Sequence, residues 1–193
     1  MHLGQYQQAW AHEQIGFDLS REIGYRRGVA IALGVLGSVA SAVEAHTEAR
    51  QRLKEAVAIY RELGQQDAVG WTLASLGIAE RGLGHFPQAQ QYLCQALQTA
   101  AKIGAFVPLT TALPGSVLLL ADQGKEEQAV ELYALAASRF PAVANSRWFE
   151  DVVGRHIAAV AATLSPEVVA AAQRRGQARD LWATVEELLD ELG

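Results

Sequence analysis

The stretch Leu83–Gly104, LGHFPQAQQYLCQALQTAAKIG, contains a pattern that recurs forty residues before it and forty residues after it. An alanine marks this interval at Ala9, Ala49, Ala89 and Ala129. A glycine marks the same interval at Gly24, Gly64 and Gly104. A fixed period of this length is typical of stacked supersecondary units, each of which cannot bury its apolar face alone. The sequence therefore predicts an array of similar units.

Each unit is predicted to contain two helices. In the first helix, apolar residues spaced by three and four form one stripe, and a glycine beside it allows a neighbouring helix to approach closely. The aligned residues there are Leu33, Leu36 and Gly37 in one unit and Leu73, Leu76 and Gly77 in the next. In the second helix, small and large apolar residues alternate by turn, at Ala49, Leu53 and Ala56 and at Ala89, Leu93 and Ala96.

This arrangement resembles tetratricopeptide repeats (TPRs), in which Leu-Gly lies on the first helix and Ala, a large apolar residue and Ala lie on the second. The resemblance implies an all-α fold, a right-handed superhelix of helix hairpins, which is an α-solenoid. The third copy is weaker, because Ser116 and Val117 replace Leu-Gly, although Ala129, Tyr133 and Ala136 keep the second-helix pattern. The period exceeds the usual length of about 34 residues. It is therefore similar to the extended repeats in the C-terminal regions of bacterial LuxR-type and STAND-type regulators, and 131–192 resembles their closing segment.

The repeat register predicts two regions, with repeats over 1–140 and a helical capping segment over 141–193. The first region divides into a half-repeat at 1–24 and repeats at about 27–64, 66–104 and 106–140. Helices are expected at about 5–23, 27–43, 46–63, 66–83, 86–103, 106–122, 126–138 and 146–163, with further helical segments to Leu192. Pro114 is expected to kink or split its helix because it removes a backbone hydrogen bond, and Ser165 is a candidate N-cap. The Pro114 bend could shape a ligand groove, although decay of the last repeat is the favoured explanation.

Composition restricts the kinds of partner. The net charge of −5 argues against a broad phosphate-binding surface, so no direct nucleic-acid binding is expected. Five arginines near the C-terminus are interpreted as part of a solvated face of mixed charge, namely Arg147, Arg155, Arg174, Arg175 and Arg179. No apolar run is long enough to span a membrane, and no signal sequence is present, so a cytoplasmic location is the default expectation. Cys94 is expected to be a buried or half-buried helical thiol.

The sequence offers few groups for catalysis or metal binding. The five histidines are scattered, His12-Glu13 lacks the second histidine of a zinc helix, and a single cysteine cannot form a cysteine-rich metal site. No glycine-rich phosphate loop ending in Gly-Lys-Ser/Thr occurs. The expectation is that the protein is not an enzyme and has no cofactor and no metal site.

The resemblance to TPRs also implies a binding surface on the concave side, lined by the first helices. The corresponding residues are Ile31, Gly34, Ser38 and Ser41, then Trp71, Ala74, Ile78 and Arg81, and finally Thr111, Leu118 and Asp122. The Lys and Asn residues that hold a terminal carboxylate in many TPRs are not at these places. A ligand is therefore expected to make apolar contacts around Trp71, with Arg81 as a cationic anchor. The alternative is that Trp71 only packs between repeats.

These features predict a scaffold that binds a protein or a peptide. The alternative is a ligand-sensing segment of a bacterial transcriptional or signalling regulator, whose effector domain lies elsewhere. The opening half-repeat adds a further expectation, because Glu13 occupies the place of Leu53, Leu93 and Tyr133. Either this helix is a cap with Glu13 in solvent, or its remaining apolar edge forms a homodimer, which is slightly favoured. The residues expected to form that edge are Trp10, Ile15, Phe17 and Leu19.

Overall fold

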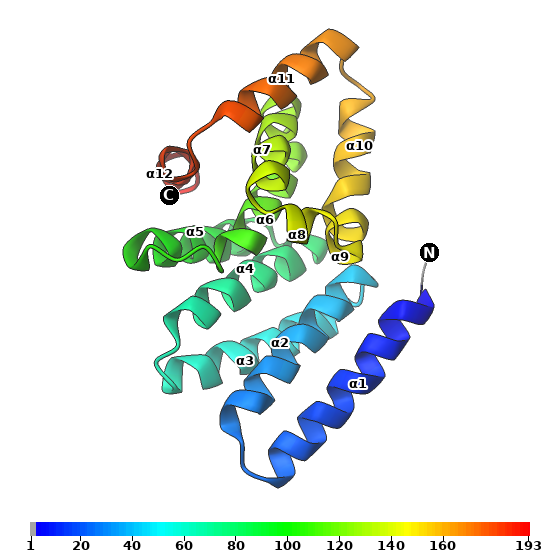
Figure 1. The fold of residues 1–193 in the computed structure, drawn as a ribbon, viewed down its shortest axis with the longest axis vertical. Coiled ribbons are helices and arrows are strands. Elements are labelled where there is room, and N and C mark those ends of the chain that lie inside the picture. The colour runs from blue at the N-terminus through cyan, green and yellow to red at the C-terminus, as the bar shows by residue number, and fades with distance from the viewer. Residues whose placement is uncertain (1–2) are drawn as a thin grey trace.

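The computed structural model describes residues 3–193, and the side chains from Gln5 onward. Met1 and His2, the first two residues of the predicted half-repeat, lie outside the described residues. Over 3–193 the structure is all-helical, and consecutive helices pack as hairpins (Figure 1). The predicted all-α solenoid is confirmed. The repeat region contains α1 (Leu3–Glu22), α2 (Arg26–Ala42), α3 (His46–Glu62), α4 (Gln66–Gly82), α5 (Phe86–Ile103), α6 (Leu109–Asp122) and α7 (Glu126–Arg139).

The repeated alanines and glycines form the contact between the two helices of a pair. Ala49, Ala89 and Ala129 are fully buried, as the alignment predicts. A Cβ on Gly37 would lie 2.5 Å from Cγ of Leu53, and 3.3 Å from the Ala49 carbonyl oxygen. Gly77 has the equivalent contacts with Leu93 and Ala89 one repeat later. These glycines therefore permit the close approach of the helices within each pair.

The turns between helices repeat at half the period of the array. Left-handed backbone conformations, with φ between 62° and 76°, occur at Gly24, Gly64, Gly84, Gly104 and Gly124. These glycines are twenty residues apart, except that position 44 of the series has no glycine. Glu44 adopts the same conformation there, with φ of 64°. The Cβ atom of glutamate is sterically crowded in the left-handed conformation, whereas glycine has no Cβ. The α2–α3 turn is therefore more strained than the turns that contain glycine.

The third pair differs from the sequence-based prediction in two respects. Helix α6 begins at Leu109 and not at residue 106, because Pro108 lies at its first turn and residues 106–108 form the preceding turn. Helix α6 also continues through Pro114 without interruption, so the expected split is not observed. Proline removes one hydrogen bond at this point, but the complete burial of Leu113 and Val117 keeps the flanking turns packed in the core.

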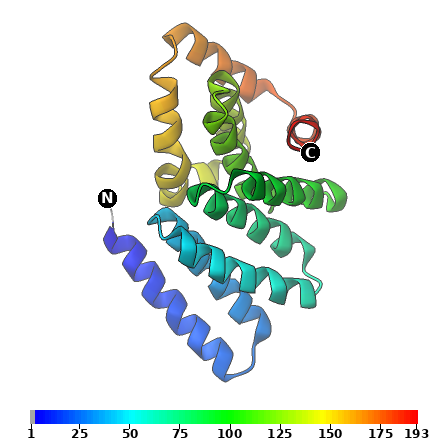
Figure 2. The same ribbon diagram turned by 180° about the vertical axis from the view of Figure 1, so that it is seen from behind.

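The C-terminal region folds back over the last repeats (Figures 1 and 2). It contains α8 (Pro141–Ala144), α9 (Arg147–Phe149), the π-helical turn η1 (Glu150–Gly154), α10 (Arg155–Ala161), α11 (Pro166–Ala178) and α12 (Leu181–Leu192). The helix predicted at 146–163 is therefore interrupted by a π turn. Ser165 is the N-cap of α11, as predicted, since its side-chain oxygen accepts a hydrogen bond from Val168 N. Helix α11 packs on α7, and α12 packs on α5.

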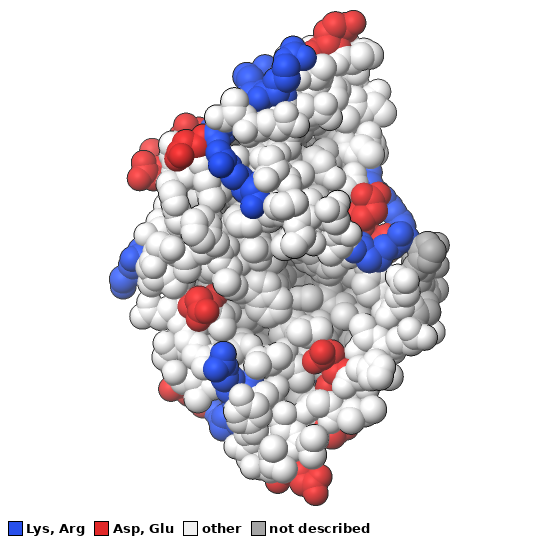
Figure 3. Space-filling view, viewed as in Figure 1, with Lys and Arg blue, Asp and Glu red and all other residues white. Residues whose placement is uncertain are grey.

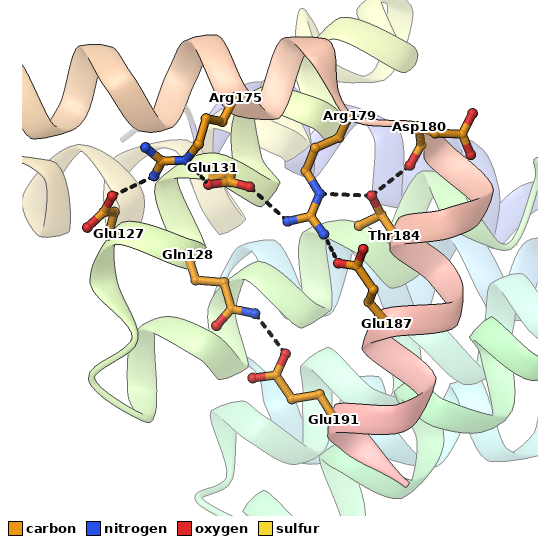
Figure 4. Close-up of polar contacts among 9 residues, drawn as sticks. All are labelled: Glu127, Gln128, Glu131, Arg175, Arg179, Asp180, Thr184, Glu187 and Glu191. Atoms are coloured by element: carbon orange, nitrogen blue, oxygen red, sulfur yellow. Dashed lines mark hydrogen bonds and ion pairs between the residues drawn. The ribbon is translucent and has the colours of Figure 1, made fainter.

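A group of ion pairs, named here the latch, joins α11 and α12 to α7 (Figure 4). Arg175 contacts Glu127 and Glu131, at 2.5 and 2.7 Å. Arg179 contacts the other oxygen of Glu131 at 2.8 Å and also pairs with Glu187. Arg175 and Arg179 therefore lie on a partly solvated face of mixed charge, as interpreted, and the fold brings acidic partners on α7 and α12 to them.

Candidate functional site

Helices α2, α4 and α6, the first helices of the three pairs, present one common face, named here the first-helix face. Figure 3 shows the molecule hollowed near its middle, where the visible surface is uncharged. The segment α8–α10 crosses the first-helix face. Trp148 of this segment donates a hydrogen bond from Nε1 to the Ser38 carbonyl oxygen, at 3.3 Å, and Tyr6 of α1 donates to Asp151 at 2.9 Å. The face is therefore divided into two cavities.

The first cavity is apolar, has a volume of about 320 Å³, and is named here the apolar cavity. It contains Ser38, Trp71 and Thr111 from the predicted binding surface. Its full lining carries no Lys, Arg, Asp or Glu and consists of Tyr6, Ala9, Val35, Ser38, Val39, Trp71, Thr110, Thr111, Val143 and Trp148. Such a site favours an uncharged, apolar group because nothing in its wall would balance a buried charge.

Trp71 has two roles in this arrangement. A Cβ on Gly34 would lie 2.7 Å from Cζ3 of Trp71, so the indole ring packs directly against the backbone of α2. Trp71 also remains partly exposed and lines the apolar cavity. The packing that the sequence analysis considered as an alternative therefore coexists with access to the cavity, and it holds the ring in one orientation.

The second cavity is polar, has a volume of about 400 Å³, and is named here the polar cavity. It contains four of the predicted residues, Ser41, Ile78, Arg81 and Leu118. The remaining lining residues come from the end of α2, the α2–α3 turn, the start of α3 and the C-terminal segment, and they are Ala42, Glu44, His46, Asp151, Val152, Arg155, His156 and Ala159. The two cavities thus share the first-helix face but differ in chemistry.

Arg81, the predicted cationic anchor, is already paired within the chain. Its Nε and Nη2 donate to the two carboxylate oxygens of Asp122, at 2.5 and 2.7 Å. This bidentate pair joins α4 to α6, and His156 Nε2 lies 3.3 Å from Arg81 Nη2. A ligand that used Arg81 would therefore have to share it with Asp122.

The other predicted residues lie outside both cavities. Ala74 is fully buried and Gly34 is covered by Trp71, whereas Ile31 is 42% exposed. The contributions of the C-terminal segment were not predicted, because the repeat register ends at 140 and gives no alignment for residues beyond it. A usable signal was the pair Arg147 and Arg155, each four residues from Asp151, a spacing that places all three on one helix face.

Asp151 is the most connected acid of the site. Its Oδ2 accepts hydrogen bonds from Tyr6 and Arg147, and its Oδ1 lies 2.5 Å from Arg155. Burial alone would raise the pKa of Asp151, but the Tyr6 hydrogen bond and the charges of both arginines hold that pKa below its usual range. Burial, together with Asp151, raises the pKa of Tyr6. Asp151 is therefore a fixed anion that connects α1 to the C-terminal segment.

Cys94 is buried, and burial raises the pKa of its thiol, which keeps it in the unreactive protonated form. Within residues 3–193, no three His, Cys, Asp or Glu side chains converge in a way that could hold a metal ion. The helices described by the structure include none with the length and apolar character needed to cross a membrane.

Comparison with known proteins agrees with the geometry of the repeats. Residues 28–102 match the family model described as Tetratricopeptide repeat, a range that spans most of α2 through α5. No curated protein and no solved structure matches the chain. The match and the consecutive helix hairpins together support a TPR-like repeat architecture, with the family match confined to residues 28–102.

Proposed function

We propose that the protein is a scaffold that binds a protein or peptide partner on its first-helix face. TPR arrays generally mediate protein–protein interaction, and the repeats carry the corresponding pattern. The observation that carries the proposal is the apolar cavity, because it is an uncharged recess in that face with a tryptophan held rigidly at its wall. A preorganised aromatic wall binds an apolar group at low entropic cost.

The shape of the face favours one mode of binding. Because α8–α10 cross the face, the hollow is too short for a long extended peptide along all three pairs. The partner inserts one large apolar side chain between Trp71 and Trp148, and its flanking residues contact the rim. Burial of such a side chain contributes about 1.5–3 kcal/mol. No cofactor, metal or nucleic acid takes part in this function.

A second copy of the chain is the proposed partner for α1. Helices α3 and α5 each pack between two neighbouring helices, whereas α1 packs mainly on α2. Its free side exposes Ile15 and Ile23 at 66% and Leu19 at 55%, spaced by four residues along one face. Trp10, which the sequence analysis placed on this edge, instead packs inward beneath Arg52, whose guanidinium carbon lies 4.7 Å from the indole centroid. The proposed homodimer therefore uses the stripe Ile15, Leu19 and Ile23.

The alternative function is a ligand-sensing segment of a bacterial regulator acting in the cytoplasm. The polar cavity is the feature that favours it, because ionic and hydrogen-bonding groups from the repeats and from the C-terminal segment meet there. A ligand bridging them would couple the two regions of the chain.

Selection from a random peptide display library tests the scaffold function. Peptides selected on the wild type are expected to contain one large apolar residue and to bind Trp71→Ala at least about tenfold more weakly. Trp182→Ala is the matched control, since Trp182 stacks on Phe106 outside the apolar cavity. Equal affinity for a folded Trp71→Ala variant would reject the apolar cavity as the binding site.

A further inference from the structure

The polar cavity contains polar atoms that the fold leaves without partners. Three buried side-chain atoms of the described residues have neither a hydrogen bond nor an ion pair, and two of them, Ser41 Oγ and His46 Nδ1, belong to residues that line this cavity. The third, Ser116 Oγ, belongs to the core of α6. Buried polar groups without partners are rare, because each costs about 1–3 kcal/mol. Their concentration at one cavity indicates that a polar ligand completes the site.

The Ser41 hydroxyl differs from the hydroxyls of Ser38 and Ser75, which form hydrogen bonds within their helices. Hydroxyls elsewhere in these helices donate to the carbonyl four residues earlier, as Ser38 does to Gly34 at 3.1 Å and Ser75 does to Trp71 at 3.2 Å. Ser41 is 7% exposed, yet its Oγ has no such bond. Its hydroxyl is therefore available to donate to or accept from a group in the cavity.

The charges around the cavity balance. Arg81 pairs with Asp122. Arg147 and Arg155 both pair with Asp151. Glu44 supplies a third negative charge, which balances the three arginines. Burial lowers the pKa of both His46 and His156, which makes them neutral near pH 7. A site with balanced charges of both signs disfavours a simple anion or cation, because either would leave one set of wall charges opposed to it.

We propose that the polar cavity binds a small zwitterion of the α-amino-acid class. The ligand carboxylate lies toward Ser41, His46 and the guanidinium of Arg155, which it shares with Asp151, and its ammonium group lies toward Glu44. The assignment of carboxylate and ammonium follows from the charges and the unpartnered atoms. Because these groups come from α2, the α2–α3 turn, α3 and the C-terminal segment, the ligand joins the repeats to the segment that crosses them. This inference is independent of the peptide-binding function, since it uses the other cavity.

Thermal unfolding of the full chain, with each of the proteinogenic amino acids as probe, tests the proposal. At a concentration about a hundredfold above its Kd, a bound amino acid is expected to raise Tm by several degrees. For each amino acid, two matched probes remove one charge: the amide lacks the carboxylate, and the N-acetyl derivative lacks the ammonium group. Neither is expected to raise Tm, and calorimetry of the active amino acid then gives its Kd.

Variants connect the binding to the cavity. Ser41→Ala and Arg155→Gln are each expected to weaken binding by about tenfold or more, the effect of losing a hydrogen bond to a charged group. Ser116→Ala is the control, because it removes a buried unpartnered hydroxyl outside the cavity, and it is expected to bind as the wild type does. The proposal is overturned if no amino acid raises Tm, if the amide or the N-acetyl derivative acts equally well, or if folded Ser41→Ala and Arg155→Gln variants both bind normally.

Discussion

The two ends of the described helical array differ in how far other helices cover their apolar surface. At the C-terminal end, α10–α12 cover the last pair, and the latch fixes α11 and α12 on α7 through Arg175 and Arg179 (Figure 4). At the N-terminal end, α1 leaves Ile15, Leu19 and Ile23 exposed. The C-terminal end is thus covered within the chain, whereas the N-terminal end exposes the stripe that we propose for association.

The largest effect is expected where the closed end packs most tightly. A Cβ on Gly176 of α11 would lie 2.0 Å from the Glu131 carbonyl oxygen of α7, so Gly176→Ala forces two backbones apart. Urea unfolding is expected to show a loss of about 3 kcal/mol. Gly16→Ala in α1 is the control at the open end, because nothing lies within 4 Å of its Cβ position, and it is expected to gain up to about 1 kcal/mol. Similar stability of the two variants would show that the ends do not differ in this way.

The proposed self-association through Ile15, Leu19 and Ile23 is tested by placing a charged side chain among these three residues. Leu19→Glu is expected to weaken self-association by about a hundredfold, or about 2.7 kcal/mol, because a carboxylate would be buried in an apolar interface. Sedimentation velocity at tens of micromolar is expected to show a dimer for the wild type and a monomer for this variant. Leu63→Glu, at an exposed leucine in the turn after α3, is expected to stay dimeric. A monomeric wild type would remove the dimer.

Ion pairs at the two ends should differ in strength. Arg179 bonds to Thr184 at 3.0 Å as well as to Glu131 and Glu187, and its side chain is 23% exposed. Arg179→Gln is expected to lower the free energy of unfolding by about 1–2 kcal/mol. Arg26→Gln, which breaks the exposed pair of Arg26 with Glu62, is expected to cost at most about 0.5 kcal/mol. Chemical denaturation measures both, and equal costs would mean that the latch contributes no more than a surface pair.

A smaller change in stability is expected at the α2–α3 turn, where Glu44 takes the place of the glycine found in the other turns. Glu44→Gly relieves a left-handed φ of 64° and is expected to stabilise the protein by up to about 1 kcal/mol. The reciprocal change, Gly124→Ala, places a Cβ at a φ of 72° and is expected to cost about 1 kcal/mol. Thermal unfolding gives both signs, and destabilisation by Glu44→Gly would indicate that the Glu44 side chain itself stabilises the α2–α3 turn.

The repeat pattern in the sequence predicted the helices of the repeats well, but it could not predict contacts between distant parts of the chain. The period of forty residues located α1–α5 and α7 within a few residues, because burial of Ala49 and Ala89 depends on neighbours at fixed spacing. Seven of the residues implied by the resemblance to TPRs line the two cavities, and their role in binding stays a prediction. The contact of His156 with Arg81 and the crossing of the first-helix face by Trp148 depend on how the C-terminal segment folds back. That segment has no repeat register from which its position could be predicted.

The central claim, that a partner binds in the apolar cavity, is tested most directly by NMR of the four tryptophan indole N–H groups. Trp71 and Trp148 line the cavity, whereas Trp10 and Trp182 do not. On titration with a selected peptide, the Trp71 and Trp148 indole signals are predicted to move in proportion to the bound fraction, while those of Trp10 and Trp182 stay in place. Movement of the Trp10 or Trp182 signal, with the other two unchanged, would contradict the account.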